Sequence, residues 1–579
     1  MDQPEKNATA FRIVTLVALI GLLMFFRACS PSDIFDNDQP RTSSYMVDIV
    51  TNGHWVIQNE PDGRLMTKPP MVPWVSSMVI MATGTFDDWT FKSASVLAFI
   101  VTTVLVWRFG DQMGGGPASG VGFLAAVCWV CNPLAFKQMY NARPDMMLTM
   151  WMLIGVWCVY QQQRNWRDKT DSPIGMIALF WISISGGLMT KGPPALIPLL
   201  WLVGMIWHSK GWRHCRPTVQ PAFALMALLP PIFWLMAALD IRPDWISTLY
   251  SESADRLFGT GETGQRHDSP WYNIPVYVVY RLLPASLTFL LAVATLRFQY
   301  PTIRRKSLWA VWWVALITII FIIPKGRRAD YIHPTGLGIA LTVAMLIVHL
   351  SAHRPVVARV YRGMLLLGGV LALGCALTSP LWVKSPGPLP IATTTLEIVD
   401  NVRQVARVIV FVSCLALGLG GLVTIVCAIK HSFVHGSVAF TFATAGILGL
   451  YAGAFSSHAQ GRDGDVLHVI ADNARLIAKK EDLPVRCATI NQVPIQALLG
   501  FNETFDDSTM SDMSNGGLLI AGPHHQTDVD RMFGERLQLL LRTSGLKGND
   551  AFQIMLYRLT PTPRSAGDGG KSKPDSACK

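Results

Sequence analysis

Cations stand next to proline motifs at three places in this sequence, at Lys68, Arg143 and Lys191. Lys68 and Arg143 directly precede proline, and Lys191 precedes Gly-Pro-Pro. Proline is favoured at the first position of a helix, because its missing N–H would have no partner there. Each motif therefore predicts a helix that begins beside a cation. A helix N-terminus and a cation together suit a phosphate, so we expect these residues to hold an anionic group.

A fourth basic cluster contains Lys325, Arg327 and Arg328, followed by Tyr331 and His333. One interpretation is that these groups bind a phosphate and stabilise the charge that develops on it as a leaving group. The other is that the basic side chains reach towards lipid headgroups, as interfacial cations often do. Both interpretations stay open at this point.

A transfer reaction also needs a group that takes the proton from the attacking nucleophile. The candidates in the first outer loop are Asp33, Asp36 and Asp38. Asp38 stands out because Arg41 follows it one short turn later. Residue types alone leave Asp38 as a candidate base or an ordinary loop acid.

Asp145 is the second candidate carboxylate. It follows the Arg143-Pro144 motif and would lie in the first turn of a helix. A structural role is also open to it, because the helix dipole favours an acid there and Arg143 is close enough to pair with it.

These residues belong to a chain whose composition is that of a membrane protein. Of its 579 residues, 51% are hydrophobic and 15% charged, and the mean hydropathy is +0.34. Apolar runs of about 18 residues or more recur, long enough to cross a hydrocarbon core of roughly 30 Å as helices. The net charge of +11 is spread over short loops between these runs, which indicates membrane orientation and no nucleic-acid partner.

The sequence predicts an all-α polytopic fold with about 13 transmembrane helices. The predicted spans begin near Phe11, Phe91, Ser119, Asp145, Ile174, Pro193, Pro221, Trp271, Ser307, Tyr331, Tyr361, Val405 and Gly436. With the N-terminus inside, four basic loops face the cytoplasm, at 161–170, 208–216, 297–306 and 351–362, as the positive-inside rule expects. An odd number of spans then places the C-terminal tail outside.

Three regions follow from this organisation. Residues 1–455 form the membrane domain, with a long first outer loop at 30–90 that is expected to be functional. Residues 456–560 form a small extracytoplasmic α/β domain, with a strand at 517–521 and helices near 463–480 and 528–542. Residues 561–579 are rich in Gly, Ser, Pro and Lys and are expected to be disordered. The short apolar stretch at 71–81 is expected to lie in the interface or re-enter.

The motifs, taken in order, resemble those of the GT-C glycosyltransferases, in particular the lipid A aminoarabinose transferases and the protein O-mannosyltransferases. The resemblance covers roughly the first 350 residues and rests on the following stretches: Asp38-Gln-Pro-Arg41, Gly53-His-Trp55, Lys68-Pro-Pro-Met-Val-Pro-Trp74, Ala142-Arg143-Pro144-Asp145, Thr190-Lys191-Gly192-Pro193, His267-Asp-Ser-Pro270-Trp271-Tyr272 and Lys325 to Pro334.

The resemblance implies roles for several residues. Asp38 matches the proposed catalytic base of the family, and Lys68 matches a lysine that contacts the carrier phosphate. Arg143 and Asp145 match an Arg-x-Asp pair, and Tyr331 matches a tyrosine in a late outer loop. The remaining substrate-binding candidates are Arg41, Lys191, His267, Lys325, Arg327 and Arg328.

The sequence departs from the family in one respect that bears on a metal. The aminoarabinose transferases commonly have Glu before the Lys-Pro-Pro lysine, where it joins a histidine like His267 in a metal site, but this chain has Thr67. A divalent metal is therefore not claimed. Asp36 lies two residues before Asp38, so a shift in register would exchange their roles.

The resemblance implies an inverting transferase in the cell membrane that moves a monosaccharide from a polyprenyl-phosphate carrier, on the outer face. The acceptor class stays open among lipid, glycan and protein, and membrane lipids surround the chain. The alternative is a transporter or flippase of a lipid-linked anion. A transporter is expected to place ionisable groups near the bilayer midplane, whereas here they gather at the outer ends of the predicted spans.

Overall fold

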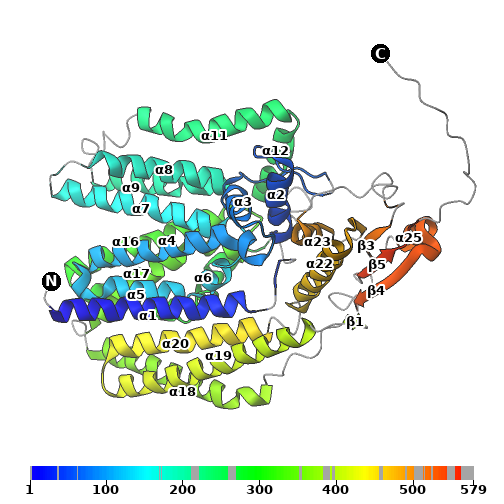
Figure 1. Ribbon diagram of the computed structural model, residues 1–579. Helices are drawn as coiled ribbons and strands as arrows, with labels where there is room; N and C mark the ends of the chain where they lie inside the picture. The colour runs from blue at the N-terminus through cyan, green and yellow to red at the C-terminus, as the bar shows by residue number, and fades with distance from the viewer. Residues whose placement is uncertain are drawn as a thin grey trace, which may run out of the picture.

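Long helices lying side by side make up most of the protein, and smaller elements gather beyond one end of them (Figure 1). The computed structural model describes residues 3–30, 32–34, 38–61, 63–168, 170, 172–209, 221–258, 269–350, 355–382, 391–393, 398–455, 461–488, 492–500, 513, 516–522, 526–543 and 554–561.

The helices up to residue 209 are α1 (Gln3–Ala28), α2 (Gln39–Asn52), α3 (Met71–Thr83), α4 (Asp88–Gly114), α5 (Val121–Val130), α6 (Pro133–Gln138), α7 (Asp145–Arg167), α8 (Ile174–Lys191), the 3-10 turn η2 (Pro193–Leu196) and α9 (Ile197–Ser209).

The second half of the helical region continues the same arrangement. Its elements are α11 (Pro221–Ile241), α12 (Trp245–Phe258), α14 (Asn273–Tyr280), α15 (Ala285–Ala294), α16 (Pro301–Ile322), the 3-10 turn η4 (Ala329–Ile332), α17 (Thr335–Val348), α18 (Pro355–Trp382), α19 (Ile398–Ile429) and α20 (Phe433–Leu450). A helix therefore lies in every stretch where the sequence predicts a span.

Eight of the described helices are long and apolar enough to cross a membrane, and the bent pair α14 and α15 would make a ninth. Four shorter apolar helices, at 71–83, 121–130, 193–207 and 335–348, accompany them. The expected class, a polytopic helical membrane protein, is confirmed. The number of about 13 spans stays a prediction.

Small residues allow the last three long helices to pack closely. Gly369 of α18 and Gly421 of α19 approach so nearly that a Cβ atom at either position would lie 2.9 Å from the other's carbonyl oxygen. Close backbone approach at small residues is a principal source of helix association in lipid, where burial of apolar surface adds little.

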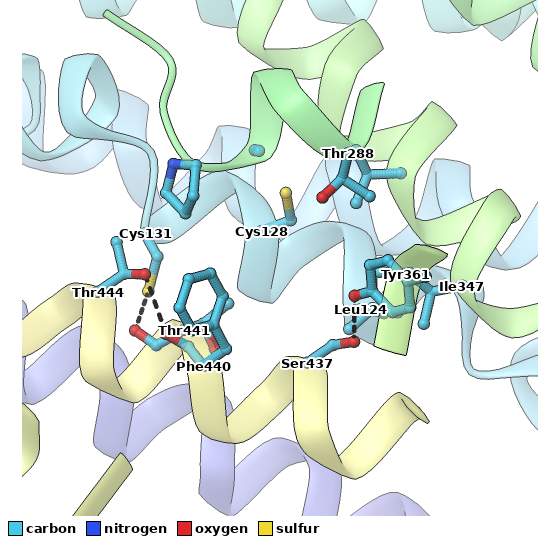
Figure 2. A pocket seen from close by; sticks show the side chains of 13 residues that line it. Leu124, Cys128, Cys131, Thr288, Ile347, Tyr361, Ser437, Phe440, Thr441 and Thr444 are labelled. Carbon is cyan, nitrogen blue, oxygen red and sulfur yellow. Dashed lines mark hydrogen bonds between the residues drawn. The ribbon is translucent and has the colours of Figure 1, made fainter. Parts of the chain in front are cut away.

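A small cavity of about 50 Å³ separates α5 and α15 from α18 and α20 (Figure 2). Several polar groups on its wall are paired with protein atoms. Tyr361 and Ser437 share a hydrogen bond of 2.6 Å, and Cys131 donates to the carbonyl oxygen of Thr441 at 3.4 Å. Cys128 also faces this cavity and is a free thiol, as is Cys131, which agrees with cysteines acting as small apolar residues.

The first outer loop is folded into two helices and a short turn. In α4, Asp87 and Thr90 form a reciprocal capping box: Asp87 accepts from the backbone N–H of Thr90, and the Thr90 hydroxyl accepts from that of Asp87. The helix α3 has 13 residues, or roughly 20 Å, and is too short to cross a bilayer. It packs between α2 and α4, which fixes the loop against the membrane helices.

A five-stranded sheet lies beyond the long helices, and the helices α22 (Gly461–Glu481), α23 (Gln492–Leu499) and α25 (Gln526–Phe533) accompany it in the described part of the chain. The strand order is β1-β4-β5-β3-β2, in β1 (Ile391–Thr393), β2 (Val485–Ala488), β3 (Gly517–Ala521), β4 (Leu537–Thr543) and β5 (Met555–Leu559). Strands β2 and β3 are parallel, and the other pairs are antiparallel. The strand β1 comes from the segment between α18 and α19, so this sheet is not built from the C-terminal sequence alone.

The expected helix at 528–542 is wrong in its second half. The helix α25 (Gln526–Phe533) ends before Gly534, whose φ of 44° stops it, and β4 follows. Leucines at alternate positions 537, 539 and 541 suit a strand, and pairing with β5 overrides any helical tendency of this stretch.

Candidate active site at one end of the helices

Asp38 begins α2 but does not cap it with its side chain. Its carboxylate lies 2.7 Å from Nζ of Lys68 and 3.5 Å from Nη1 of Arg328. Lys68 is placed by the Pro69-Pro70 segment that leads into α3, and Arg328 directly precedes η4. Three segments far apart in the sequence therefore meet at Asp38.

The charges around Asp38 determine its protonation. Burial by itself raises the pKa of this carboxyl, but Lys68, Arg328 and Arg143 together outweigh burial and hold the pKa well below its ordinary value. Asp38 is therefore ionised at neutral pH as long as these cations face it.

Arg143 and Lys191 converge on Asp145, the first residue of α7. Nε of Arg143 lies 3.7 Å from one carboxylate oxygen of Asp145, and Nζ of Lys191 lies 2.5 Å from the other. Arg143 is 4% exposed and Asp145 is 5% exposed, so this is a buried group of charges. Lys191 also lies over the ring of Tyr331, 4.8 Å from its centre.

Two further residues belong to the site and were missed from the sequence. Asp330 of η4 accepts from Nη1 of Arg143 at 2.7 Å, and Lys137 of α6 lies 3.2 Å from the same carboxylate. Burial raises the pKa of Asp330, but Lys137 and Arg143 outweigh it, so the net shift is downward. Asp330 lies within the basic stretch from Lys325 to Pro334, and its position among cations is the feature of the sequence that could have identified it.

These residues form one charge cluster. Arg143 acts electrostatically on Asp38, and Lys68 acts on Asp145, so the charges of the two halves influence one another. We define the charge cluster as Asp38, Lys68, Lys137, Arg143, Asp145, Lys191, Arg328 and Asp330. It contains five cations and three carboxylates, an excess of two positive charges. Such an excess in a largely buried place favours an anionic ligand.

A cavity of about 380 Å³ opens beside the charge cluster. Asp145, Lys191, Asp330 and Tyr331 are among its polar lining groups, and apolar side chains of η2, α9 and α16 form most of its wall. We call it the α9–α16 cavity. Its composition suits a ligand with one anionic end and a long apolar part.

Three other predicted site residues, Arg41, Lys325 and Arg327, have different surroundings. Arg41 pairs with the buried Glu60 at 2.7 Å. Arg327 donates to the carbonyl oxygen of Ile322 at 2.9 Å and to that of Ser269, and Lys325 is exposed. His267 and Asp36 lie outside the described residues.

Asp33 is part of a second ion network, which joins the start of the first outer loop to α1 and α4. It pairs with Arg27 at 2.9 Å and with the fully buried Lys92 at 2.7 Å, and Lys92 also pairs with Asp88 of its own helix. Burial raises the pKa of Asp33, but Lys92 and Arg27 outweigh it and lower the pKa to about 2. Asp88 in turn lies 3.1 Å from His468 of α22, which joins the C-terminal region to α4.

A metal site has no support in the part of the chain that the structure describes, where no group of three or more His, Cys, Asp or Glu could hold an ion. The family's metal-site histidine corresponds to His267, which is not among these residues.

Comparisons with known proteins show what the chain is similar to. Residues 67–234 match the family model described as dolichyl-phosphate-mannose-protein mannosyltransferase, a range that contains Lys68, Arg143, Asp145 and Lys191. The undecaprenyl phosphate-alpha-4-amino-4-deoxy-L-arabinose arabinosyl transferase of Enterobacter sp. is 23% identical over 343 residues, and that of Yersinia pestis (strain Pestoides F) is 22% identical over 339 residues. Each match covers 57% of this chain and 58% of the relative, so the chain spans little more than half of the relatives' length.

Solved structures show the same fold. The crystal structure of ArnT from Cupriavidus metallidurans bound to undecaprenyl phosphate superposes with a TM-score of 0.71, covering 96% of this chain and all of that one at 15% identity. The apo structure of the same protein gives a TM-score of 0.66. The chain therefore has the fold of a polytopic membrane protein of the GT-C type. The resemblance to the ArnT-like and protein mannosyltransferase families that the sequence predicted is confirmed.

Proposed function

We propose that this protein is an inverting glycosyltransferase. It moves a monosaccharide from a polyprenyl-phosphate carrier to a lipid, glycan or protein acceptor at the outer face of the cell membrane. The observation that carries the proposal is a cluster of charges with excess cations next to a cavity with mainly apolar walls. The names of the relatives and of the solved neighbour, all of which mention undecaprenyl phosphate, support the same class of carrier.

In this proposal the carrier phosphate binds among Lys68, Arg143, Lys191 and Arg328, and the isoprenoid chain lies in the α9–α16 cavity. The phosphate would supply the negative charge that the cluster lacks. Asp330 holds the side chain of Arg143 through an ion pair of 2.7 Å, and Asp145 holds that of Lys191 through one of 2.5 Å. Preorganised cations need little rearrangement as charge develops on the leaving group.

Asp38 acts as the general base. Its carboxylate takes the proton from the acceptor's hydroxyl or amino group while that atom bonds to the anomeric carbon. The bond between this carbon and the phosphate oxygen breaks, and its electron pair remains on the phosphate, next to the cations. A single displacement of this kind inverts the anomeric configuration.

Donor binding also prepares the base. Without donor, Lys68 and Arg328 face Asp38 and hold its pKa low, which makes the carboxylate a weak base. A bound phosphate shares these cations, so the pKa of Asp38 rises towards a value at which proton transfer is favourable. The base therefore gains strength only when a donor is present.

Orientation is a part of the same proposal. The charge cluster lies near the first outer loop and near α23, which packs against α2 (Figure 1). With the N-terminus in the cytoplasm, residues 30–90 and the region after residue 456 lie on the extracytoplasmic side, which is where a carrier sugar would be transferred.

The test is reconstitution of the purified full chain in lipid vesicles with undecaprenyl phosphate carrying 4-amino-4-deoxy-L-arabinose or mannose, plus envelope lipids, glycans and proteins as acceptors. Mass spectrometry should find one acceptor heavier by a sugar residue, with release of an equal amount of undecaprenyl phosphate. Movement of the intact sugar lipid across the bilayer, with no transfer, would instead support the transporter alternative and contradict our proposal.

A further inference from the structure

His333 has a ring nitrogen that is buried but not satisfied. The side chain is 1% exposed and lies against Trp129, with ring centres 5.2 Å apart and ring planes tilted by 42°. Its Nδ1 lies 2.9 Å from the hydroxyl of Thr149. Its Nε2 is buried and has no hydrogen-bond partner among the residues that the structure describes. A buried polar atom without a partner is costly, so a ligand that supplies one would be favoured.

The neighbouring threonine decides which ring nitrogen carries the proton. The hydroxyl of Thr149 donates to the carbonyl oxygen of Asp145 at 2.9 Å, so its proton is already used. Thr149 therefore accepts from Nδ1–H of His333, which leaves Nε2 with a lone pair and no proton. Burial also lowers the pKa of His333 to about 4, so the ring is neutral near pH 7. Nε2 is accordingly a hydrogen-bond acceptor.

An acceptor at this position selects among ligand groups. His333 and Thr149 both line the α9–α16 cavity, together with Lys191 and Tyr331. A phosphate oxygen is itself an acceptor and would be repelled by the Nε2 lone pair, whereas Lys191 attracts it. A hydroxyl or amino group can donate to Nε2. The cavity thus offers separate places for an anion and for a hydrogen-bond donor.

We propose that Nε2 of His333 accepts a hydrogen bond from a hydroxyl or amino group of the carrier-linked sugar, and so distinguishes the sugar-bearing donor from the bare carrier phosphate. This inference rests on the proposed function and deepens it. After transfer, the carrier phosphate keeps its contacts with the cations but no longer has the sugar group that contacts His333. The enzyme therefore holds its donor more tightly than its lipid product.

The experiment compares the binding of two kinds of lipid to the full chain in nanodiscs. One is undecaprenyl phosphate, and the other is undecaprenyl phosphate with 4-amino-4-deoxy-L-arabinose or mannose, whichever the wild type binds more tightly. The variant His333→Phe keeps a planar ring without the nitrogen. It should bind the sugar-bearing lipid roughly 10- to 100-fold more weakly and undecaprenyl phosphate within about 2-fold of wild type. His333→Gln, which restores an acceptor, should recover part of the loss.

Two further variants keep the test decisive. Thr149→Val removes the group that fixes the proton on Nδ1 and should weaken only the sugar-bearing lipid. Ser437→Ala cuts a buried polar pair at the other cavity (Figure 2) and should change neither affinity. If His333→Phe does not fold, Thr149→Val and His333→Gln carry the comparison.

The outcomes separate this inference from the proposed function. Equal weakening of both lipids, or no weakening of either, shows that His333 only packs, and overturns the inference while the transferase proposal stands. A wild type that binds both lipids equally tightly does the same. A wild type that binds neither lipid overturns both proposals.

Discussion

Oδ2 of Asp38 lies 2.7 Å from Nζ of Lys68, although Asp38 occupies the position at the start of α2 where an aspartate usually accepts from backbone amides. The side chain is therefore committed to the charge cluster and not to helix capping. A carboxylate that faces two cations and does not cap its helix is what a base regulated by its substrate would require.

Replacing Lys68 by methionine tests this coupling through pH. Loss of the lysine removes the largest attraction that lowers the pKa of Asp38, and burial then raises that pKa. Asp38 would become protonated at a higher pH, so the acid limb of the kcat/KM profile should move upward. The donor affinity should also fall, by about 10-fold or more, because a phosphate contact is lost. Lys480→Met, at an exposed site on α22, is the matched control. An unshifted acid limb in Lys68→Met would contradict the coupling.

Asp330→Asn tests the support of Arg143. This arginine is 4% exposed, and the substitution removes its short ion pair while leaving the charge buried. Breaking a buried pair in this way typically costs about 3 to 5 kcal/mol, so we expect a clear loss of thermal stability in detergent. Asp472→Asn cuts an exposed pair with Arg475 and should cost less than about 1 kcal/mol. Equal effects of the two variants would mean that Asp330 does not hold Arg143.

His468→Ala tests the link between the C-terminal region and α4. His468 lies 3.1 Å from Asp88, whose network also holds Asp33 of the first loop. Removing the imidazole should lower the stability by about 1 to 2 kcal/mol and increase proteolysis near the start of α4. The neighbouring exposed Lys479→Ala is the control. Unchanged proteolysis in His468→Ala would show that this contact does not fix the loop.

The pH dependence of stability tests the state of His333. Its pKa is about 4 in the folded protein, against an ordinary value of 6.5, so the unfolded chain binds more protons between these values. Its contribution to stability is therefore complete above pH 6.5 and falls as the pH drops towards 4, by at most about 1.4 kcal/mol per pH unit. Melting temperatures from pH 7 to pH 5 should decrease less in His333→Phe than in wild type. Parallel curves would show that His333 is not a buried neutral histidine.

The sequence predicted the membrane helices because apolar runs have one stable form in lipid. It also predicted that Lys68, Arg143 and Lys191 would meet, since each precedes a proline motif at the same end of a predicted helix. These three residues do lie in one cluster with Asp38. Their roles in binding and catalysis stay predictions.

Other features depend on contacts between distant segments, which no local pattern reveals. Asp330 looks like an ordinary turn residue until Arg143 and Lys137 are brought to it from 187 and 193 residues away. No proline separates the strand β4 from the helix before it, and pairing with β5 and β1 fixes its form. The ion pair of Arg41 with Glu60, across a turn of the first loop, is such a contact, and a role of Arg41 in substrate binding stays a prediction.

The most direct measurement of the central claim is a single turnover of the sugar-bearing undecaprenyl phosphate by wild type and by Asp38→Asn, at saturating donor. The amide keeps the size of the side chain but cannot take a proton. We predict that Asp38→Asn binds the donor at least as tightly as wild type, because Lys68 and Arg328 are freed for the phosphate, yet releases undecaprenyl phosphate about 100- to 10,000-fold more slowly. Release by Asp38→Asn at the wild-type rate would contradict the account.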